Sequence, residues 1–188
     1  MLSLKNDIDN CTETLKNGGT ILYPTDTIWG IGCDATNKKA VEKIYNIKKR
    51  DEKKSMIILL ANEYQLSKYC KTPNIFLKKI LATTHDPLTI IYPAAKNLPS
   101  NLINEDGTIA IRIVKNLFCI DLLNFFGKPI VSTSANISGS PAALNFNEIS
   151  EAIKNNVDYI VKNENTQKTS IASSILKWNG KEEIIKIR

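Results

Sequence analysis

The chain contains the stretch Lys128-Pro129-Ile130-Val131-Ser132-Thr133-Ser134-Ala135-Asn136-Ile137-Ser138-Gly139-Ser140-Pro141, in which a short apolar segment leads directly into hydroxyl groups and a carboxamide. The apolar part predicts a strand over 129–133, and the Gly and Pro that follow predict a turn. In open α/β sheets, ligands bind beyond the carboxyl ends of the strands. The hydroxyls therefore suit a phosphate, ribose or amino-acid ligand. The alternative is a Ser/Thr-rich loop that satisfies its own backbone.

Helical and strand patterns alternate along the rest of the chain. Helices are predicted over 4–15, 40–47, 63–69, 75–82, 117–126 and 148–154. Strands are predicted over 20–23, 56–60, 88–92, 108–113, 129–133, 157–161, 173–176 and 183–187. This interleaving predicts an α/β fold with an open twisted sheet flanked by helices. The spacing is too irregular for a repeated βαβ unit, so we expect a mixed sheet. We expect one domain over residues 1–188, since no linker interrupts the chain.

The composition is that of an ordinary soluble globular protein, with 43% hydrophobic and 23% charged residues. Polar residues interrupt the N-terminus, which argues against a secretory signal, and the strongest apolar run, 56–61, is too short to span a bilayer. Four scattered cysteines are expected to be core or half-buried thiols in a reducing cytoplasm. The net charge of +6 favours polyanionic partners such as nucleotides or RNA.

Several common kinds of active site are excluded by the residues that are missing. The chain has a single histidine, His85, in a Thr-His-Asp-Pro segment that predicts a surface loop, and it has no G-x-S-x-G elbow for a serine nucleophile. Zinc-ligand spacing is absent. The P-loop and dinucleotide-binding glycine patterns are absent too. A nucleotide would therefore have to bind by another route.

A second polar cluster follows the strand predicted over 20–23. It reads Tyr23-Pro24-Thr25-Asp26-Thr27-Ile28-Trp29-Gly30-Ile31-Gly32 and repeats the order of the first cluster: an apolar strand, proline, hydroxyls, and glycines that allow close backbone approach. A proline-led turn with an Asx-type cap is the alternative. Two such strand ends in one chain favour a ligand site.

Two groups of cations stand out. The first is the run Lys48-Lys49-Arg50-Asp51-Glu52-Lys53-Lys54, which follows a predicted helix. Cations are favoured at a helix C-terminus by its dipole alone, but Lys48 and Arg50 also suit a triphosphate. The second is Arg112, which lies inside an apolar strand. A charge there is expected to be paired or bound to a ligand such as a carboxylate or a phosphate.

In this order the motifs resemble the YrdC-like family, the threonylcarbamoyl-AMP synthases that begin the formation of threonylcarbamoyladenosine in tRNA. The resemblance extends from about Gly18 to the C-terminus. The matching elements are Tyr-Pro-Thr-Asp-Thr-x-x-Gly-x-Gly, Lys48-x-Arg50 with Lys54, Thr108-x-x-x-Arg112, and Ser132-Thr133-Ser134-Ala135-Asn136-x-Ser138-Gly139. The chain departs from the family pattern at Trp29, Lys49, the segment 85–89 and Ala142.

The resemblance implies roles for individual residues. The residues expected to bind ATP are Lys48, Arg50, Thr108, Ser132, Ser134, Asn136 and Arg188. Those expected to bind threonine are Thr25, Arg112 and Ser173. Lys48, Arg50 and Lys54 are expected to lie at the reacting groups and act in catalysis.

The implied reaction joins L-threonine, bicarbonate and ATP into threonylcarbamoyl-AMP and pyrophosphate. Mg²⁺ is expected to arrive with ATP, since no metal site carried by the protein is visible in the sequence. The reaction requires positioned anions rather than a covalent nucleophile. A tRNA-modifying transferase is expected to use the product in the cytoplasm, without a membrane partner.

Two rival interpretations remain open. The first is an RNA-binding module with a basic concave surface and no ATP turnover. The net charge allows weak RNA binding, but an aromatic content of 7% without an RNP-like string argues against a single-strand reader. The second is a related carbamoyl-transfer domain, as in hydrogenase-maturation proteins, where such domains lie within much longer chains.

Overall fold

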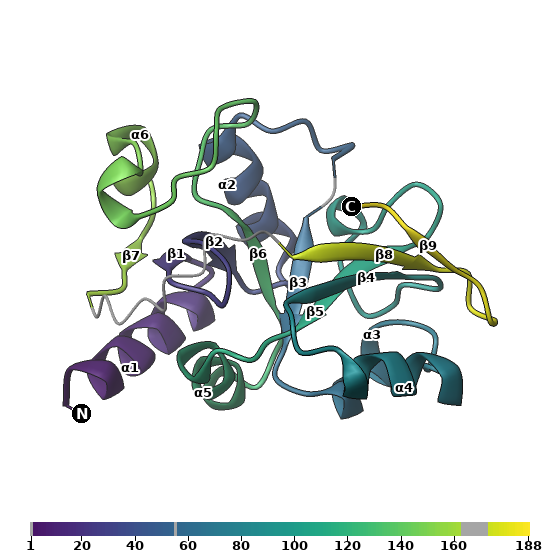
Figure 1. Ribbon diagram of the computed structural model, residues 1–188. Helices are drawn as coiled ribbons and strands as arrows, with labels where there is room; N and C mark the ends of the chain where they lie inside the picture. Colours follow the sequence, from purple (N-terminus) through teal and green to yellow (C-terminus); the bar gives the residue numbers. More distant parts are fainter. Residues whose placement is uncertain (1, 55, 163–172) are drawn as a thin grey trace.

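A nine-stranded mixed sheet forms the centre of the computed structural model, which describes residues 2–54, 56–162 and 173–188 (Figure 1). The strands are β1 (Thr20–Tyr23), β2 (Gly30–Cys33), β3 (Ile57–Leu60), β4 (Leu88–Tyr92), β5 (Ile109–Ile113), β6 (Ile130–Ser134), β7 (Tyr159–Ile160), β8 (Ser174–Trp178) and β9 (Ile184–Lys186). Their order across the sheet is β7-β1-β2-β6-β3-β5-β4-β8-β9. Strand β3 pairs parallel with β5 and antiparallel with β6. The predicted α/β fold with an open mixed sheet is confirmed.

Six α-helices and three short 3₁₀ helices lie in the described part of the chain. The α-helices are α1 (Leu2–Lys16), α2 (Lys38–Lys48), α3 (Leu66–Tyr69), α4 (Ile75–Thr83), α5 (Leu117–Phe126) and α6 (Glu151–Lys154). The 3₁₀ helices are η1 (Glu63–Gln65), η2 (Ser100–Leu102) and η3 (Phe146–Glu148). The side chains of Asn37, Asn74 and Asn116 accept hydrogen bonds from first-turn N–H groups of α2, α4 and α5. These caps satisfy donors that a helix start leaves unpaired.

Strand β2 was not predicted from the sequence, because glycine is depleted in strands. Its glycines are explained by close packing. A Cβ atom on Gly32 would lie 2.6 Å from the Val131 carbonyl oxygen and 2.7 Å from Tyr23 Cε1. Glycine alone fits between β1 and β6 at this position.

The core lies on both faces of the sheet, because alternate strand residues point to opposite sides. Leu22 of β1 belongs to the same apolar cluster as Ile44 of α2. Ile21 and Tyr23 belong to the other cluster, which includes Leu122 of α5 and residues of α1. Helix α2 therefore covers one face, whereas α1 and α5 cover part of the other (Figure 1).

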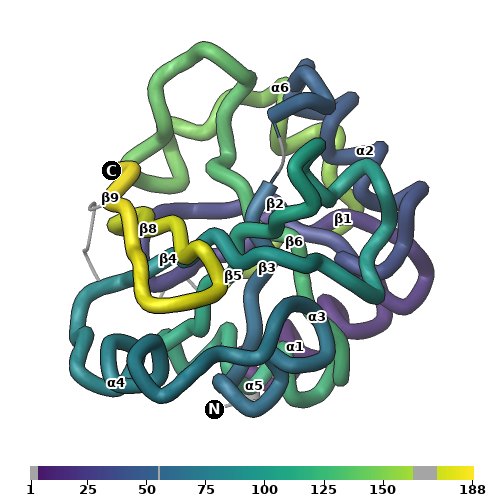
Figure 2. The backbone as a smooth tube through the Cα atoms, turned by 90° about the vertical axis from the view of Figure 1, so that its right-hand side faces the viewer, coloured from purple at the N-terminus to yellow at the C-terminus, as the bar shows by residue number. Residues whose placement is uncertain are grey.

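The outer parts of the chain surround this core. Strands β8 and β9 lie beside β4 at one edge of the sheet, and the segment that follows β6 rises above it (Figure 2). Cys11, Cys33, Cys70 and Cys119 are all free and buried, as predicted for core thiols. Within the described residues, no helix combines the length and the apolar character that crossing a bilayer requires.

Candidate functional site

The face that α1 and α5 cover only in part carries a cavity. Strand register places Leu59, Arg112, Thr89 and Ile175 side by side in one row across β3, β5, β4 and β8. Leu59 packs into the cluster that contains α5, whereas the other three line a cavity of about 440 Å³. The cavity therefore begins on the sheet where the helical cover ends.

The cavity gathers most of the residues predicted to form the site. The predicted residues that line it are Thr25, Arg50, Arg112, Ser132, Ser134, Ser173 and Arg188. They come from the loop after β1, the end of α2, strands β5 and β6, and the C-terminal segment. Lys48, Lys54, Thr108 and Asn136 are not among the lining residues. The cavity lies at the carboxyl ends of β1 and β6 as predicted, but it also extends across the sheet face.

The loop after β1, residues 24–29, forms a buried chain of hydroxyl groups. Thr25 Oγ1 donates its one proton to the Ile28 carbonyl at 2.8 Å, so the 3.0 Å bond between the hydroxyls of Thr25 and Thr27 must be donated by Thr27. Thr25 Oγ1 also accepts from Thr27 N at 3.1 Å. The order of donors along this loop is therefore fixed.

Arg112 completes that chain. Its Nη1 donates to Thr27 Oγ1 at 3.1 Å, and its Nη2 lies 3.2 Å from Asp26 Oδ1. Both charged side chains are buried, with exposed fractions of 4% and 8%. Arg112 Nε is buried without a hydrogen-bond partner among the described residues. A buried cation that lines a cavity and keeps an unused donor is suited to a carboxylate ligand.

The loop after β6, residues 135–141, is held by Lys48 at the end of α2. The Lys48 Nζ donates to the carbonyls of Ser134 at 2.5 Å and of Asn136 at 2.6 Å. Asn136 Oδ1 accepts from Ser134 Oγ at 2.5 Å, and its Nδ2 donates to the Ser140 carbonyl at 2.6 Å. Lys48 and Asn136 thus shape the cavity wall from behind.

Burial gives Lys48 an unusual acidity. Only 1% of the residue is exposed, and this burial, with the nearby positive charge of Arg50, lowers the pKa of Lys48 to about 8. Charge burial disfavours the ammonium form. Lys48 therefore still carries its charge at neutral pH, but it loses the charge more readily than an exposed lysine.

The neighbouring cations differ in exposure. Arg50 lines the cavity, and its Nε donates to the Lys54 carbonyl at 2.7 Å. Burial also lowers the pKa of Arg50. The Lys54 side chain is exposed and does not line the cavity.

At the opposite wall, two hydroxyls and the last residue meet. Ser173 Oγ lies 2.8 Å from Thr89 Oγ1, and both residues are buried. Arg188 donates from Nε and Nη2 to the Ser173 carbonyl at 3.3 and 3.0 Å. These bonds fix the C-terminal guanidinium at the cavity.

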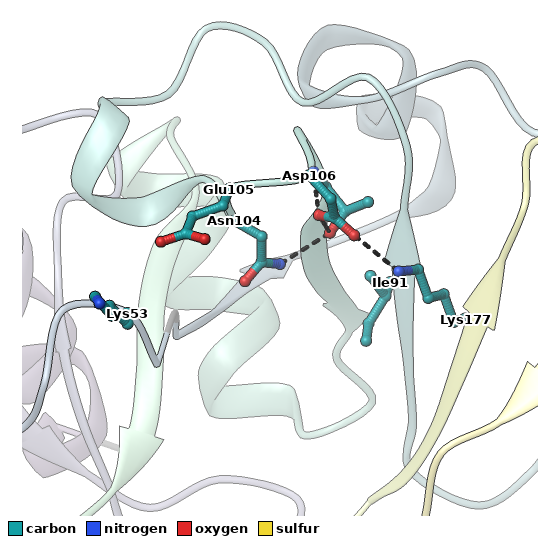
Figure 3. Close-up of a pocket in the computed structure, with 7 residues that line it drawn as sticks. Lys53, Ile91, Asn104, Glu105, Asp106 and Lys177 are labelled. Atoms are coloured by element: carbon teal, nitrogen blue, oxygen red, sulfur yellow. Dashed lines mark hydrogen bonds and ion pairs between the residues drawn. The ribbon is translucent and has the colours of Figure 1, made fainter.

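Thr108 lines a second pocket of about 470 Å³. Figure 3 labels the other residues of this pocket, among them Asn104, Asp106 and Lys177. Thr108 Oγ1 donates to Asp106 at 2.6 Å and accepts from Asn104 Nδ2 at 2.9 Å, while Lys177 pairs with the other Asp106 oxygen at 2.8 Å. Asn104 and Ile91 line both pockets. Thr108 is thus beside the main cavity rather than in it.

Sequence reasoning missed some lining residues and gave others no role. Thr27, Trp29 and Asn104 line the cavity. Trp29 packs on Phe146 with ring centroids 5.0 Å apart. Thr89 could have been noticed as a polar residue inside the apolar strand β4. Nothing in the sequence around Asn104 indicates a site.

Histidine and clustered metal-ligating side chains are the two other features that could supply chemistry. His85 is exposed, as the loop prediction expected. Over residues 2–54, 56–162 and 173–188, no three His, Cys, Asp or Glu side chains gather as metal ligands would. The described residues thus offer anion-binding groups rather than a carboxylate cage.

A comparison with known protein families agrees with this arrangement. The Sua5/YciO/YrdC family model, described as telomere recombination, matches residues 13–188. The chain belongs to the Sua5/YciO/YrdC family. The resemblance stated from the motifs is therefore confirmed.

Relatives in this family are similar over most of the chain. The threonylcarbamoyl-AMP synthase of Pseudoalteromonas translucida (strain TAC 125) is 37% identical over 186 residues, which cover 96% of this chain and 98% of the relative. E. coli YciO matches with a TM-score of 0.82 at 24% identity, covering 96% of this chain and 87% of that one. P. abyssi Sua5 complexed with L-threonine matches with a TM-score of 0.88 at 23% identity. That match covers 96% of this chain and 53% of the P. abyssi chain, so the chain spans about half of that protein.

Family membership explains the shared sheet, because the two solved structures match it across nearly the whole chain. At under 25% identity these structures show the Sua5/YciO/YrdC fold alone. The roles of individual cavity residues therefore rest on their contacts in this chain.

Proposed function

We propose that the chain is a threonylcarbamoyl-AMP synthase. It would convert L-threonine, bicarbonate and ATP into threonylcarbamoyl-AMP, pyrophosphate and water. The observation that carries the proposal is the meeting of three guanidinium groups, Arg50, Arg112 and Arg188, with several hydroxyls in one cavity. Two anionic substrates need such a set of donors. A relative that carries this enzyme name, and that the match covers to 98% of its length, supports it.

The threonine would bind at Arg112. The unused Nε–H of this residue suits a carboxylate, and the buried hydroxyls of Thr25 and Ser173 line the same cavity. Planar guanidinium groups bind carboxylates through two parallel hydrogen bonds, which fixes orientation as well as affinity. The amine would then be held in a set direction for carbamate formation.

ATP would bind along the wall formed by β6 and Arg50. Ser132 and Ser134 line this wall, and Lys48 and Asn136 hold its loop from behind. Arg188 would reach the nucleotide from the opposite wall of the same cavity. Thr108 would reach the nucleotide from the second pocket. Mg²⁺ would enter as part of the substrate, bound to the triphosphate oxygens.

The chemistry would use position and charge. The threonine amine takes up carbon dioxide or bicarbonate as a carbamate, and a carbamate oxygen attacks the α-phosphorus in line as pyrophosphate leaves. Arg50 would stabilise the negative charge that develops on the phosphate oxygens, and Lys54 would add positive charge from its exposed position. Lys48 would contribute to catalysis through the loop that its ammonium holds. No covalent enzyme intermediate is required. We expect a tRNA-modifying transferase in the cytoplasm to consume the product.

The direct test is pyrophosphate release from Mg-ATP and bicarbonate, with and without L-threonine, and with L-serine as the control. Release that depends on threonine, and is weak with serine, is the expected result. Equal release without any amino acid would contradict the proposal. Absence of nucleotide binding, combined with salt-sensitive RNA binding, would favour the RNA-binding alternative.

A further inference from the structure

We propose that Asp26 is a positioning residue for Arg112: it holds the guanidinium in the one orientation that presents its unused N–H groups to the amino-acid carboxylate. This inference deepens the proposed function and rests on it. The observation behind it is that Asp26 touches Arg112 from behind the cavity. Asp26 is not itself among the lining residues.

Arg112 is held at two of its three nitrogens by neighbouring residues of one loop. Thr27 Oγ1 accepts from Nη1 at 3.1 Å, and Asp26 Oδ1 lies 3.2 Å from Nη2. One partner would leave the planar group free to swing about that contact, whereas two partners on different nitrogens fix the direction of the plane. With the guanidinium plane fixed, the N–H bond of the third nitrogen, Nε, also has a fixed direction.

The hydroxyl chain makes this support rigid. Because Thr25 Oγ1 gives its proton to the Ile28 carbonyl, the Thr27 hydroxyl donates to Thr25 and keeps a lone pair for Arg112. Reversal of this order would leave the Ile28 carbonyl without its bond from Thr25. The loop therefore offers Arg112 an acceptor at a fixed place, beside a fixed negative charge.

The charge of Asp26 points to the same role. A carboxylate such as Asp26, next to a cavity that binds another carboxylate and a triphosphate, would by itself repel both ligands. Its presence is accounted for by Arg112, which is 4% exposed and would otherwise be a buried cation without a counter-ion. Asp26 thus stabilises Arg112 in place, while the free donors of Arg112 meet the ligand.

The test compares Asp26→Asn with Asp34→Asn. Asp34 is a matched control because it is also buried, pairs with Lys128 at 2.8 Å, caps Thr36 and does not line the cavity. The first measurement is made without any ligand: rotation of the Arg112 guanidinium, followed by NMR at its Nε–H. We expect slow rotation in the wild type and in Asp34→Asn, and faster rotation in Asp26→Asn.

The second measurement is steady-state kinetics. Asp26→Asn is expected to raise the KM for threonine about tenfold, as loss of an orienting partner typically does. The kcat and the KM for ATP should change much less. Asp26→Glu, which keeps the charge, is expected to recover part of the threonine KM. Should Asp26→Asn fail to fold, Asp26→Ser, which also removes the charge, replaces it in both measurements.

The outcomes separate this inference from the proposed function. Unchanged guanidinium rotation and unchanged threonine KM in Asp26→Asn would overturn the positioning role while leaving the enzyme activity intact. An equal loss of kcat in Asp26→Asn and Asp34→Asn, with no specific change in the KM for threonine, would indicate a merely structural role for Asp26. This result would also overturn the positioning role. Absence of threonine-dependent turnover in the wild type would instead overturn the proposed function, and with it the ligand named here.

Discussion

The loop after β1, residues 24–29, and the loop after β6, residues 135–141, each combine hydroxyl groups with a buried cation at the end of a strand. In the first, Arg112 receives support from side chains and keeps a donor for the cavity. In the second, the Lys48 ammonium donates to two backbone carbonyls of the segment it supports. The same residue types thus serve recognition in one loop and architecture in the other.

The difference follows from the donors. A guanidinium has five N–H groups in a rigid fork, so it can be anchored on one edge and bind on another. An ammonium has three donors around one atom, and two of them already reach carbonyls here. A buried arginine is therefore better suited to bind a ligand, and a buried lysine is better suited to hold a backbone segment in place.

The largest expected effect is that of Arg112→Lys. The variant keeps a positive charge near Asp26 but loses the fork, so the threonine-dependent kcat/KM should fall by about a hundredfold, or ~3 kcal/mol. ATP binding should be nearly unchanged. Kinetics with varied threonine, together with calorimetry of ATP binding, check this. If Arg112→Lys showed the same threonine kinetics as the wild type, a positive charge alone would be enough to bind threonine, and the proposed difference between arginine and lysine would be wrong.

Lys48→Met is expected to have a smaller effect, of about 2 kcal/mol on ATP-dependent turnover, because it leaves the Ser134 and Asn136 carbonyls without their donor. The KM for ATP should rise more than that for threonine. Lys43→Met is the control: Lys43 lies on the same helix, and its Nζ donates to the Gly18 carbonyl at 3.0 Å away from the cavity. Equal effects of Lys48→Met and Lys43→Met would contradict the role of Lys48 in holding the loop after β6.

The pH dependence of stability tests the same residue. Lys48 titrates near 8 in the folded chain and near 10.5 when unfolded, because burial disfavours its charge. Between these values the unfolded chain holds a proton that the folded chain has lost, so raising the pH adds stability. The free energy of unfolding of the wild type relative to Lys48→Met should therefore rise from pH 8 to 10.5. Denaturant titrations at several pH values check this, and a constant difference would contradict it.

The smallest expected effect is that of Asn136→Ala, which removes the side-chain bonds to Ser134 and Ser140 and the long 3.5 Å contact with Lys48. The variant keeps the bonds of Lys48 to the two backbone carbonyls. A loss of about 1 kcal/mol in stability is expected, with a several-fold rise in the KM for ATP. Thermal unfolding and ATP kinetics measure both. An effect as large as that of Lys48→Met would show that the amide, and not the ammonium, holds the loop.

Local patterns predicted most of the fold, because apolar periodicity and asparagine or glycine caps fix elements such as α5 and β6. Strand β2 was not predicted, because its glycines are required by close packing against Val131 and Tyr23 on the neighbouring strands. This packing cannot be inferred from the local sequence. The sequence predicted that the sheet is mixed, but not which strands are neighbours in it.

The site was predicted in composition more than in geometry. Arg112 stood out because a charge in an apolar strand needs a partner, and the cavity contains it. That Lys48 lies behind the wall could not be seen, because a helix-end lysine has the same local sequence whether it faces a ligand or a carbonyl. Asp26 was passed over because its contact with Arg112 exists only once β1 and β5 are brought together.

The most direct test of the contrast between the two loops is a binding titration of ligand-free protein with L-threonine and with L-threonine amide, which lacks the carboxylate. We expect threonine to bind to the wild type and to Lys48→Met, and the amide to bind far more weakly to both. In Arg112→Lys this difference between threonine and its amide should be lost. Equal binding of threonine and its amide to the wild type would contradict the assignment of Arg112 as the carboxylate-binding group.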